Sequence, residues 1–247
     1  MPEPLPTREK KPPETTLIIP VFNEESRILS TLETLEALNH SHSFNFHCLI
    51  VNDGSSDKSA TLISNFTASR NWVEIINLDR NHGKGEAVKQ GVLRTTTRTL
   101  FFIDADLPVP LQDTIPPALS LLDNDTDLVI GARRHPESRV HSRTLSREFI
   151  SRFGNFLIRQ ITGLPYLDTQ CGFKGFRRDC ATRLFRRITS SGYLFDLELL
   201  VQAQRLGFRV KEVPVDWYHI PDGSFRPGRD SLRTLLELLY LKSRGSL

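Results

Sequence analysis

The sequence predicts an α/β fold in which helices flank a mostly parallel β-sheet. Short runs of β-branched and aliphatic residues alternate with segments of helical periodicity, and polar residues gather where the runs end. Strands that alternate with helices are typical of βαβ units, which build parallel sheets. With 247 residues and 38% hydrophobic content, the chain can bury a sizeable core. We therefore expect one α/β domain with a C-terminal appendage.

The first half of the chain supplies five of the predicted strands and two predicted helices. Residues 24–39 and 57–66 place aliphatic or aromatic side chains at three- and four-residue intervals, which predicts amphipathic helices that cover the sheet. The predicted strands between and after them are β-rich or apolar runs: residues 16–22, 46–52, 73–78, 100–103 and 128–130.

The pattern changes after residue 139. The prediction there is a long helix, a loop, a shorter helix and a strand, over residues 147–161, 167–175, 196–205 and 210–217 in turn. Residues 231–241 are predicted to form a helix with a broad apolar face flanked by Lys and Arg, which can lie at a bilayer interface, pack on the domain's own core or contact another subunit. The expected divisions are a disordered leader, the domain and the amphipathic helix: residues 1–14, 15–226 and 227–247.

Composition narrows the class of protein. A net charge of +3 is too small for a dedicated nucleic-acid binder, although a phosphorylated partner remains compatible with it. The three cysteines are odd in number and lack C-x-x-C spacing, which indicates neither a disulfide framework nor a zinc site. The sequence shows neither a signal peptide nor 18 consecutive apolar residues, so we expect a cytoplasmic protein whose membrane contact is peripheral.

Acidic residues follow the fourth predicted strand as Asp104-Ala105-Asp106. Alternate residues of an extended chain project to the same side, so Asp104 and Asp106 can present oxygen ligands to Mg²⁺ or Mn²⁺. Such a cation would neutralise a diphosphate leaving group. Two acids after a strand also occur in solvated turns and helix caps, so the motif gains weight only from its context.

That context consists of polar residues at the ends of the first two predicted strands and in the connection that follows the third. After the first strand, Phe22 can meet a base while Asn23 and Glu24 bind ribose or base; after the second, Asp53 can accept from a base N–H and Gly54 permits close backbone approach. Helix capping is the alternative role at both places. Residues 81–85 lack the Walker A pattern, but their turn can bring Lys84 to the donor. Carboxyl ends of parallel strands meet at one edge, which predicts a single crevice.

These motifs, in this order, resemble the family 2 glycosyltransferases, which have the GT-A fold. The segments 168–174 (Asp-Thr-Gln-Cys-Gly-Phe-Lys) and 195–200 (Phe-Asp-Leu-Glu-Leu-Leu) resemble the dolichyl-phosphate glucosyltransferase branch, close kin of the dolichyl-phosphate mannose synthases. The resemblance runs from about residue 15 to residue 226.

The resemblance implies a role for individual residues. Asp104 and Asp106 would hold the metal and the diphosphate, and Asp168 would be catalytic, as a base, as a contact to sugar hydroxyls, or by orienting Lys174 or an Arg. The implied donor site is Pro20, Phe22, Asn23, Glu24, Asp53, Gly54, Lys84 and Asp104. The implied acceptor-phosphate site is Arg133, Arg147, Ser151, Lys174 and Arg226.

The implied reaction is inverting transfer of a hexose from a nucleotide-diphosphate sugar to a polyprenyl phosphate of the dolichyl type. Glucose from UDP-glucose is favoured; mannose from GDP-mannose, a soluble or polysaccharide acceptor, and a nucleotide-sugar-binding regulatory module are the alternatives. The expected location is the cytoplasmic face of a membrane, with a membrane-protein partner or a second copy of the chain as further contacts. Pro108 departs from the mannose synthases, which have a metal-shell Gln at this position.

Overall fold

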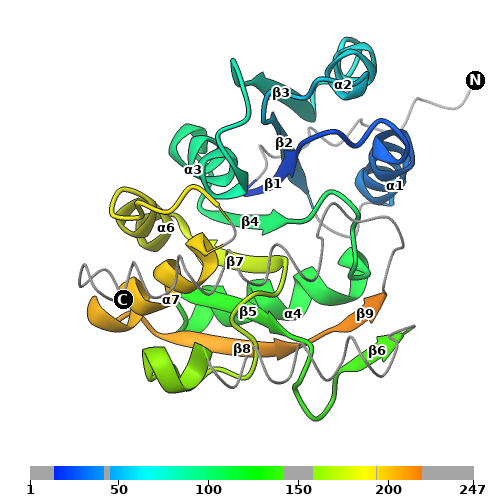
Figure 1. Cartoon of the computed structure of the whole chain (residues 1–247). Helices are drawn as coiled ribbons and strands as arrows, with labels where there is room; N and C mark the ends of the chain where they lie inside the picture. Colours follow the sequence, from blue (N-terminus) through cyan, green and yellow to red (C-terminus); the bar gives the residue numbers. More distant parts are fainter. Residues whose placement is uncertain (1–13, 42–44, 142–157, 193, 219–247) are drawn as a thin grey trace, which may run out of the picture.

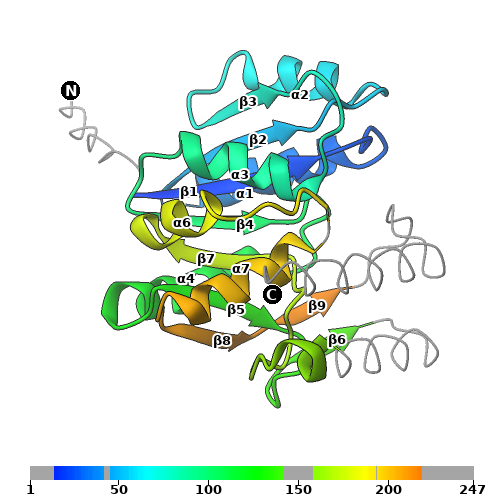
Figure 2. The ribbon, with the colours of Figure 1, turned by 60° about the vertical axis from the view of Figure 1, so that its left-hand side comes forward.

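The computed structural model describes residues 14–41, 45–141, 158–192 and 194–218. Within them, one large sheet lies between two layers of helices (Figures 1 and 2). The architecture matches the predicted α/β fold. None of the helices described here combines the length and apolar character needed to cross a membrane.

The large sheet has seven strands in the order β3-β2-β1-β4-β7-β5-β8 among the described residues. Its pairs are parallel except that β7 runs antiparallel to both β4 and β5, so the predicted mostly parallel sheet is confirmed. The strands are β1 (Thr15–Val21), β2 (Phe46–Asn52), β3 (Val73–Asn77), β4 (Thr99–Ile103), β5 (Leu128–Ala132), β7 (Phe173–Arg177) and β8 (Val210–Pro214).

Both faces of this sheet are covered, which explains why its central strands are apolar along their whole length. Neighbouring residues of β4 point to opposite faces: Phe101 packs in one buried cluster and Phe102 in the other. The Phe101 face is covered by α1 (Ile28–His40), α2 (Ser59–Thr67) and α4 (Leu111–Asn124). The Phe102 face is covered by α3 (Lys84–Arg94), α6 (Arg178–Phe185) and α7 (Phe195–Arg205).

Strand β7 corrects the predicted loop over residues 167–175. Gly175 is central to it, because a Cβ at this position would overlap the ring of Phe101 on β4. Gly and Lys within the segment hid the strand, since both are uncommon in strands. The loop therefore ends at residue 172 and the chain enters the middle of the sheet.

The predicted strand over residues 210–217 is divided. Pro214 is the last residue of β8, and the chain then forms β9 (Asp216–Tyr218), which pairs with β6 (Arg139–His141) in a separate two-stranded parallel sheet. His141 and Tyr218 stack across this pair with ring centroids 4.5 Å apart. Division of the strand moves Trp217 away from the β8 edge and toward Arg133.

Helix boundaries differ from the predictions by a few residues. The first helix begins at Ile28 rather than at residue 24, because residues 25–27 form a turn and the backbone N–H groups of Glu24 and Glu25 donate to Ser59 and Asp57 at the start of α2. Residues 158–162 are helical, whereas the rest of the predicted helix at 147–161 lies outside the described residues. The leader and the helix at 231–241 lie outside them too, apart from residue 14.

Candidate functional site

The carboxyl ends of β1 and β2 are joined by side-chain hydrogen bonds. The backbone N–H of Asn23 donates to Ser55 Oγ at 3.0 Å, and the N–H of Ser56 donates to Asn23 Oδ1 at 2.9 Å. Asn23 adopts a left-handed backbone with φ 55°, a conformation that Asn tolerates better than most residues. The side-chain amide of Asn23 therefore fixes the shape of this turn through a hydrogen bond within the protein.

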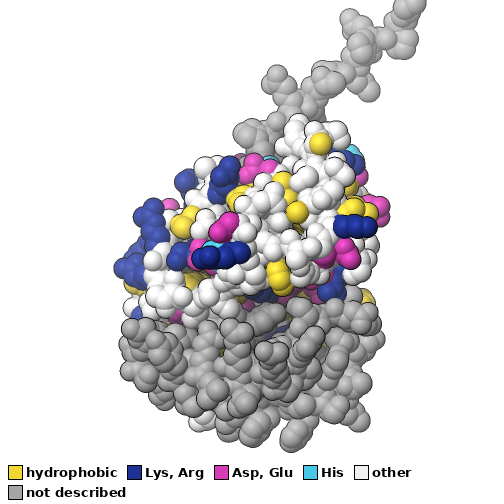
Figure 3. Space-filling model, turned by 45° about the horizontal axis from the view of Figure 1, so that its top comes forward, with side chains coloured by type: hydrophobic (Ala, Val, Ile, Leu, Met, Phe, Trp, Pro, Cys, Tyr) yellow, Lys and Arg dark blue, Asp and Glu magenta, His cyan; other side chains and the backbone are white. Residues whose placement is uncertain are grey.

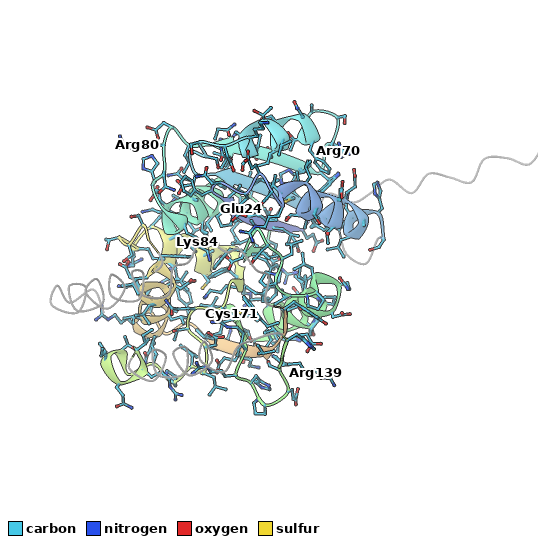
Figure 4. The ribbon with its side chains drawn as sticks, turned by 45° about the vertical axis from the view of Figure 1, so that its right-hand side comes forward. Glu24, Arg70, Arg80, Lys84, Arg139 and Cys171 are labelled. Carbon is cyan, nitrogen blue, oxygen red and sulfur yellow. The ribbon has the colours of Figure 1, made fainter. Side chains whose placement is uncertain are left out.

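Phe22 and Glu24 lie on either side of this turn. Phe22 is 39% exposed, so its ring is available to a base or to another apolar group. Pro20, two residues earlier, is half-buried within β1. The Glu24 carboxylate pairs with Arg27, one turn away along the chain. Figure 4 shows Glu24, Lys84 and Cys171 near the middle of the molecule, whereas Arg70 and Arg139 lie toward its edge.

Asp53 and Gly54 hold the connection between β3 and α3. The two carboxylate oxygens of Asp53 accept the backbone N–H groups of His82 and Gly83, each at 2.8 Å. Gly54 has φ 63°, and a Cβ there would overlap the backbone of Arg80. The close backbone approach predicted at Gly54 is thus made by the protein's own chain.

Lys84 begins α3 at the end of this connection. The backbone N–H of Gly85 donates to the carbonyl of Ser191 at 2.7 Å, which fixes the start of the helix from the opposite side. The Lys84 Nζ lies 2.5 Å from Asp104 Oδ1. The predicted turn therefore brings Lys84 to the first acid of the Asp-x-Asp motif.

Asp104 and Asp106 stand at the end of β4. The backbone N–H of Asp104 donates to the carbonyl of Gly172 at 3.0 Å, and a Cβ on Gly172 would overlap the Asp104 carboxylate. Burial, together with the charge of Asp104, raises the pKa of Asp106 to about 6. A cation between the two acids would remove this penalty, so the pair fits a divalent metal.

The donor set points to the kind of metal. Among the described residues, no His, Cys, Asp or Glu joins Asp104 and Asp106 to make a group of three. Mg²⁺ in such sites is held by one or two carboxylates and completes its shell with water and substrate phosphates. The two carboxylates therefore suit a hard cation that arrives with a diphosphate.

Asp168 lies next to β5 and holds Arg133. Its two oxygens accept from Arg133 Nε at 2.6 Å and from Nη2 at 2.8 Å. Burial alone would raise the pKa of Asp168, but the charge and hydrogen bonds of Arg133 hold it below the ordinary value. Of the roles expected for Asp168, the geometry fits the one in which it orients an Arg.

Lys174 corrects one predicted contact. Its side chain is fully buried, its Nζ lies 2.7 Å from Asp196 Oδ1 and it donates to the carbonyl of Cys171 at 2.8 Å. An acceptor phosphate cannot reach an ammonium enclosed in this way, so the prediction that Lys174 binds it is wrong. The other predicted acceptor residues, Arg147, Ser151 and Arg226, lie outside the described residues.

For three residues of the site, the sequence predicted no individual role. Gly172 leaves room for Asp104, Asp196 neutralises Lys174, and Glu212 on β8 accepts the backbone N–H groups of Leu167 and Asp168. Gly172 and Asp196 stand inside the two segments that carried the resemblance, which was the available signal. Glu212 had none, because its partners are backbone atoms 44 and 45 residues away.

Comparisons with known proteins identify the family and the fold of the chain. The model of the family described as glycosyl transferase family 2 matches residues 16–185. A dolichyl-phosphate beta-glucosyltransferase of Trichomonas vaginalis is 34% identical over 86% of this chain and 66% of its own length, so the chain spans about two thirds of that relative. The mouse dolichyl-phosphate beta-glucosyltransferase is 30% identical over 94% of this chain and 75% of its own.

A solved structure has the same fold. Glucosyl-3-phosphoglycerate synthase from Mycobacterium tuberculosis, crystallised with Mn²⁺ and uridine-diphosphate-glucose, aligns with a TM-score of 0.65 at 19% identity, over 93% of this chain and 78% of that one. At this identity the likeness concerns the fold. The extent of the family match, together with the mouse relative, leads to the conclusion that the chain belongs to glycosyl transferase family 2.

Proposed function

We propose that this protein moves glucose from UDP-glucose to the phosphate of dolichol, with inversion at the sugar and at a membrane surface. The names of its relatives support the donor sugar and the acceptor. The observation that carries the proposal is that an acidic side, made by Asp104 and Asp106, and a basic side, made by Arg133, lie close together in the site. Asp104 lies close enough for its charge to act on Arg133, and the segment 168–172 contacts both residues.

The donor would lie over the ends of β1 and β2. Phe22 offers an exposed ring to the base, and Asn23 and Glu24 offer polar atoms to the base or ribose. Asp53 and Gly54 act on the donor through the connection that they hold, which carries Lys84. Pro20 restricts the backbone near the end of β1. Lys84 would then contact the diphosphate.

The acidic side would handle the leaving group. A divalent cation, Mg²⁺ or Mn²⁺, held by Asp104 and Asp106 would neutralise the charge that develops on the departing diphosphate. Lys84 adds a positive charge beside Asp104. Charge stabilisation of this kind, in fixed positions, supplies a large share of the rate of such reactions.

The basic side would bind the acceptor. Arg133 presents a planar guanidinium that is oriented by Asp168, and guanidinium groups suit phosphates. Arg147, Ser151 and Arg226 are proposed as further contacts. A phosphate monoester has a second pKa of about 6, so the acceptor is largely dianionic at neutral pH and attacks without a base. The oxygen–carbon bond to the sugar forms as the bond to the diphosphate breaks, and UDP leaves.

The test is transfer of radiolabelled sugar to dolichyl phosphate in detergent, with UDP-glucose and GDP-mannose in parallel and with Mg²⁺, Mn²⁺ or chelator. We expect label in the lipid from UDP-glucose alone, lost on chelation and restored by added metal. Label from GDP-mannose instead would show that the donor is GDP-mannose and not UDP-glucose. Hydrolysis of the donor without labelled lipid would contradict the acceptor, and binding of the donor without either reaction would favour a regulatory module.

A further inference from the structure

Lys84 and Asp104 form an ion pair between the start of α3 and the end of β4. Their Nζ and Oδ1 atoms are 2.5 Å apart, and each side chain keeps about a quarter of its surface in solvent, 22% for Lys84 and 27% for Asp104. Asp104 is also the acid that fits a metal. The ammonium therefore sits where a bound cation would have to contact the same carboxylate.

The position of Lys84 is imposed by the backbone around it. Asp53 accepts the two N–H groups that precede it, and the carbonyl of Ser191 accepts the N–H that follows it. Gly83 has φ 100°, and a Cβ there would lie 2.5 Å from the Ser191 carbonyl oxygen. A helix start that is held from both sides keeps the Lys84 side chain directed at Asp104.

A second lysine shows that the pairing is selective. Lys174 lies near the same aromatic ring: the Nζ atoms of Lys84 and Lys174 are 5.2 and 5.4 Å from the centroid of Phe102. Lys174 is enclosed and already matched by Asp196. Lys84 is the partly exposed member, so it is the cation of this pair that can leave its carboxylate for a ligand.

A divalent ion on Asp104 and an ammonium on the same carboxylate repel each other. The repulsion between two like charges grows with each charge, so a doubly charged ion is repelled twice as strongly as a singly charged one at the same distance. A donor diphosphate brings negative charge that attracts both cations. Metal binding and departure of Lys84 from Asp104 are therefore favoured together, once the diphosphate is present.

We propose that Lys84 is a built-in counter-ion for the metal carboxylate: it holds Asp104 in the empty enzyme, weakens metal binding there, and moves to the diphosphate when donor and metal bind. The proposal rests on the proposed function for the presence of a metal and a diphosphate. It makes the affinity for metal depend on the donor, and by linkage the affinity for donor depend on the metal to the same extent.

The experiment is a titration of the full-length protein with Mn²⁺ alone, by calorimetry or by the electron paramagnetic resonance of free Mn²⁺, repeated with saturating UDP. Lys84→Met should bind Mn²⁺ alone about tenfold more tightly than the wild type, because the competing charge is gone. The factor by which UDP strengthens Mn²⁺ binding should shrink in the same variant. Lys84→Gln, which is one bond shorter but keeps a polar, uncharged end, should behave alike and serves if the Met variant folds poorly.

Lys89→Met is the matched control. It removes the same charge from the same helix, but its Nζ donates to the carbonyl of Ile188 rather than to a carboxylate. Lys89→Met should leave the affinity for Mn²⁺ within about twofold of the wild type, because the substitution removes no charge paired with Asp104. Equal gains in both variants, or no gain in Lys84→Met and Lys84→Gln, would overturn the proposal. These titrations contain neither sugar nor acceptor, so the outcome is independent of which sugar and lipid the protein uses.

Discussion

Asp104 and Asp106 are two residues apart and differ in what surrounds them. Asp104 is paired with Lys84 and borders Gly172, whereas Asp106 has a pKa raised by burial and by the charge of Asp104. The difference suggests a division of labour in which Asp104 exchanges one cation for another. Asp106 would contribute mainly once a metal is present.

Asp104→Asn and Asp106→Asn should each lower transfer by at least about a hundredfold, as expected when charge stabilisation of a leaving group is lost. Both variants should keep the wild-type circular dichroism spectrum, because neither acid supports the core. The measurement is initial transfer rate at saturating metal. Asp113→Asn, an exposed acid in the first turn of α4, is the control and should retain full activity. Full turnover by either site variant would remove the metal role.

Asp168 is tied to stability through its buried pair with Arg133. Asp168→Asn would leave the guanidinium enclosed without its counter-charge, which typically costs about 3 kcal/mol of unfolding free energy. The folded pKa of Asp168 is lowered, so its contribution is present above the ordinary pKa of 3.8 and is lost as pH falls through the folded value. Urea unfolding should therefore show the full deficit at pH 7 and a smaller one below about pH 4.

A double variant separates this pair from its surroundings. Replacing Arg133 with Met in the Asp168→Asn background removes the unpaired charge, so we expect part of the lost stability to return. Strict addition of the two single effects would show that the pair contributes nothing as a unit. Activity should stay low in the double variant, since the proposed phosphate contact is gone.

At the scale of elements, two connections bring the charged residues of the site together. Residues 79–85 carry Lys84 to β4, and residues 168–172 join Arg133 to Asp104. Both are held by backbone hydrogen bonds to carboxylates, Asp53 for the first and Glu212 for the second. The site therefore depends on acids that fix its connections.

Gly172 gives a test of the second connection. In Gly172→Ala the new methyl group overlaps the Asp104 carboxylate, which must turn away. Displacements of about 1 Å in a site can cost about a hundredfold in rate, so transfer and Mn²⁺ affinity should both fall while the protein stays folded. Gly163→Ala is the control: nothing lies within 4 Å of its Cβ, and its φ of 69° costs stability alone. Equal activity in the two variants would contradict the role given to Gly172.

Much of this arrangement could be predicted from the sequence. The strand ends that carry Asn23, Asp53 and Asp104 do converge, because parallel strands present their carboxyl ends at one edge. The burial of Lys174 could not be predicted, since a lysine in a glycine-containing segment looks exposed until β7 is placed inside the sheet. Glu212 was equally invisible, because its partners are distant backbone groups.

At the scale of the molecule, the sheet separates two buried clusters. Each strand has side chains that pack with both of them. Phe101 belongs to one cluster and Phe102 to the other, so loss of β4 would open both. The surface around them mixes charges of both signs, with Lys and Arg most crowded at the left edge of the face in Figure 3. We expect the described domain to behave as one cooperative unit.

The two tryptophans test cooperativity because they lie near opposite edges of the sheet. Trp72 packs against Phe46 beside β3, and Trp217 stands in β9 beyond β8. In Trp72→Phe and Trp217→Phe, the remaining fluorescence should report the same urea midpoint as far-ultraviolet circular dichroism of that variant. Two midpoints that differ beyond error would show that the donor half and the β5–β8 half unfold separately.

Strand β7 also shapes how the protein can be made. Its residues are translated long after β4 and β5, yet it separates these two strands, which do not pair with each other. A nascent chain that ends before residue 173 therefore has an uncovered edge on β4, and uncovered edges favour association with other chains. The joining of β4 to β5 must wait for residues 173–177 to leave the ribosome, and until then the growing chain keeps an open strand edge in what becomes the middle of the sheet.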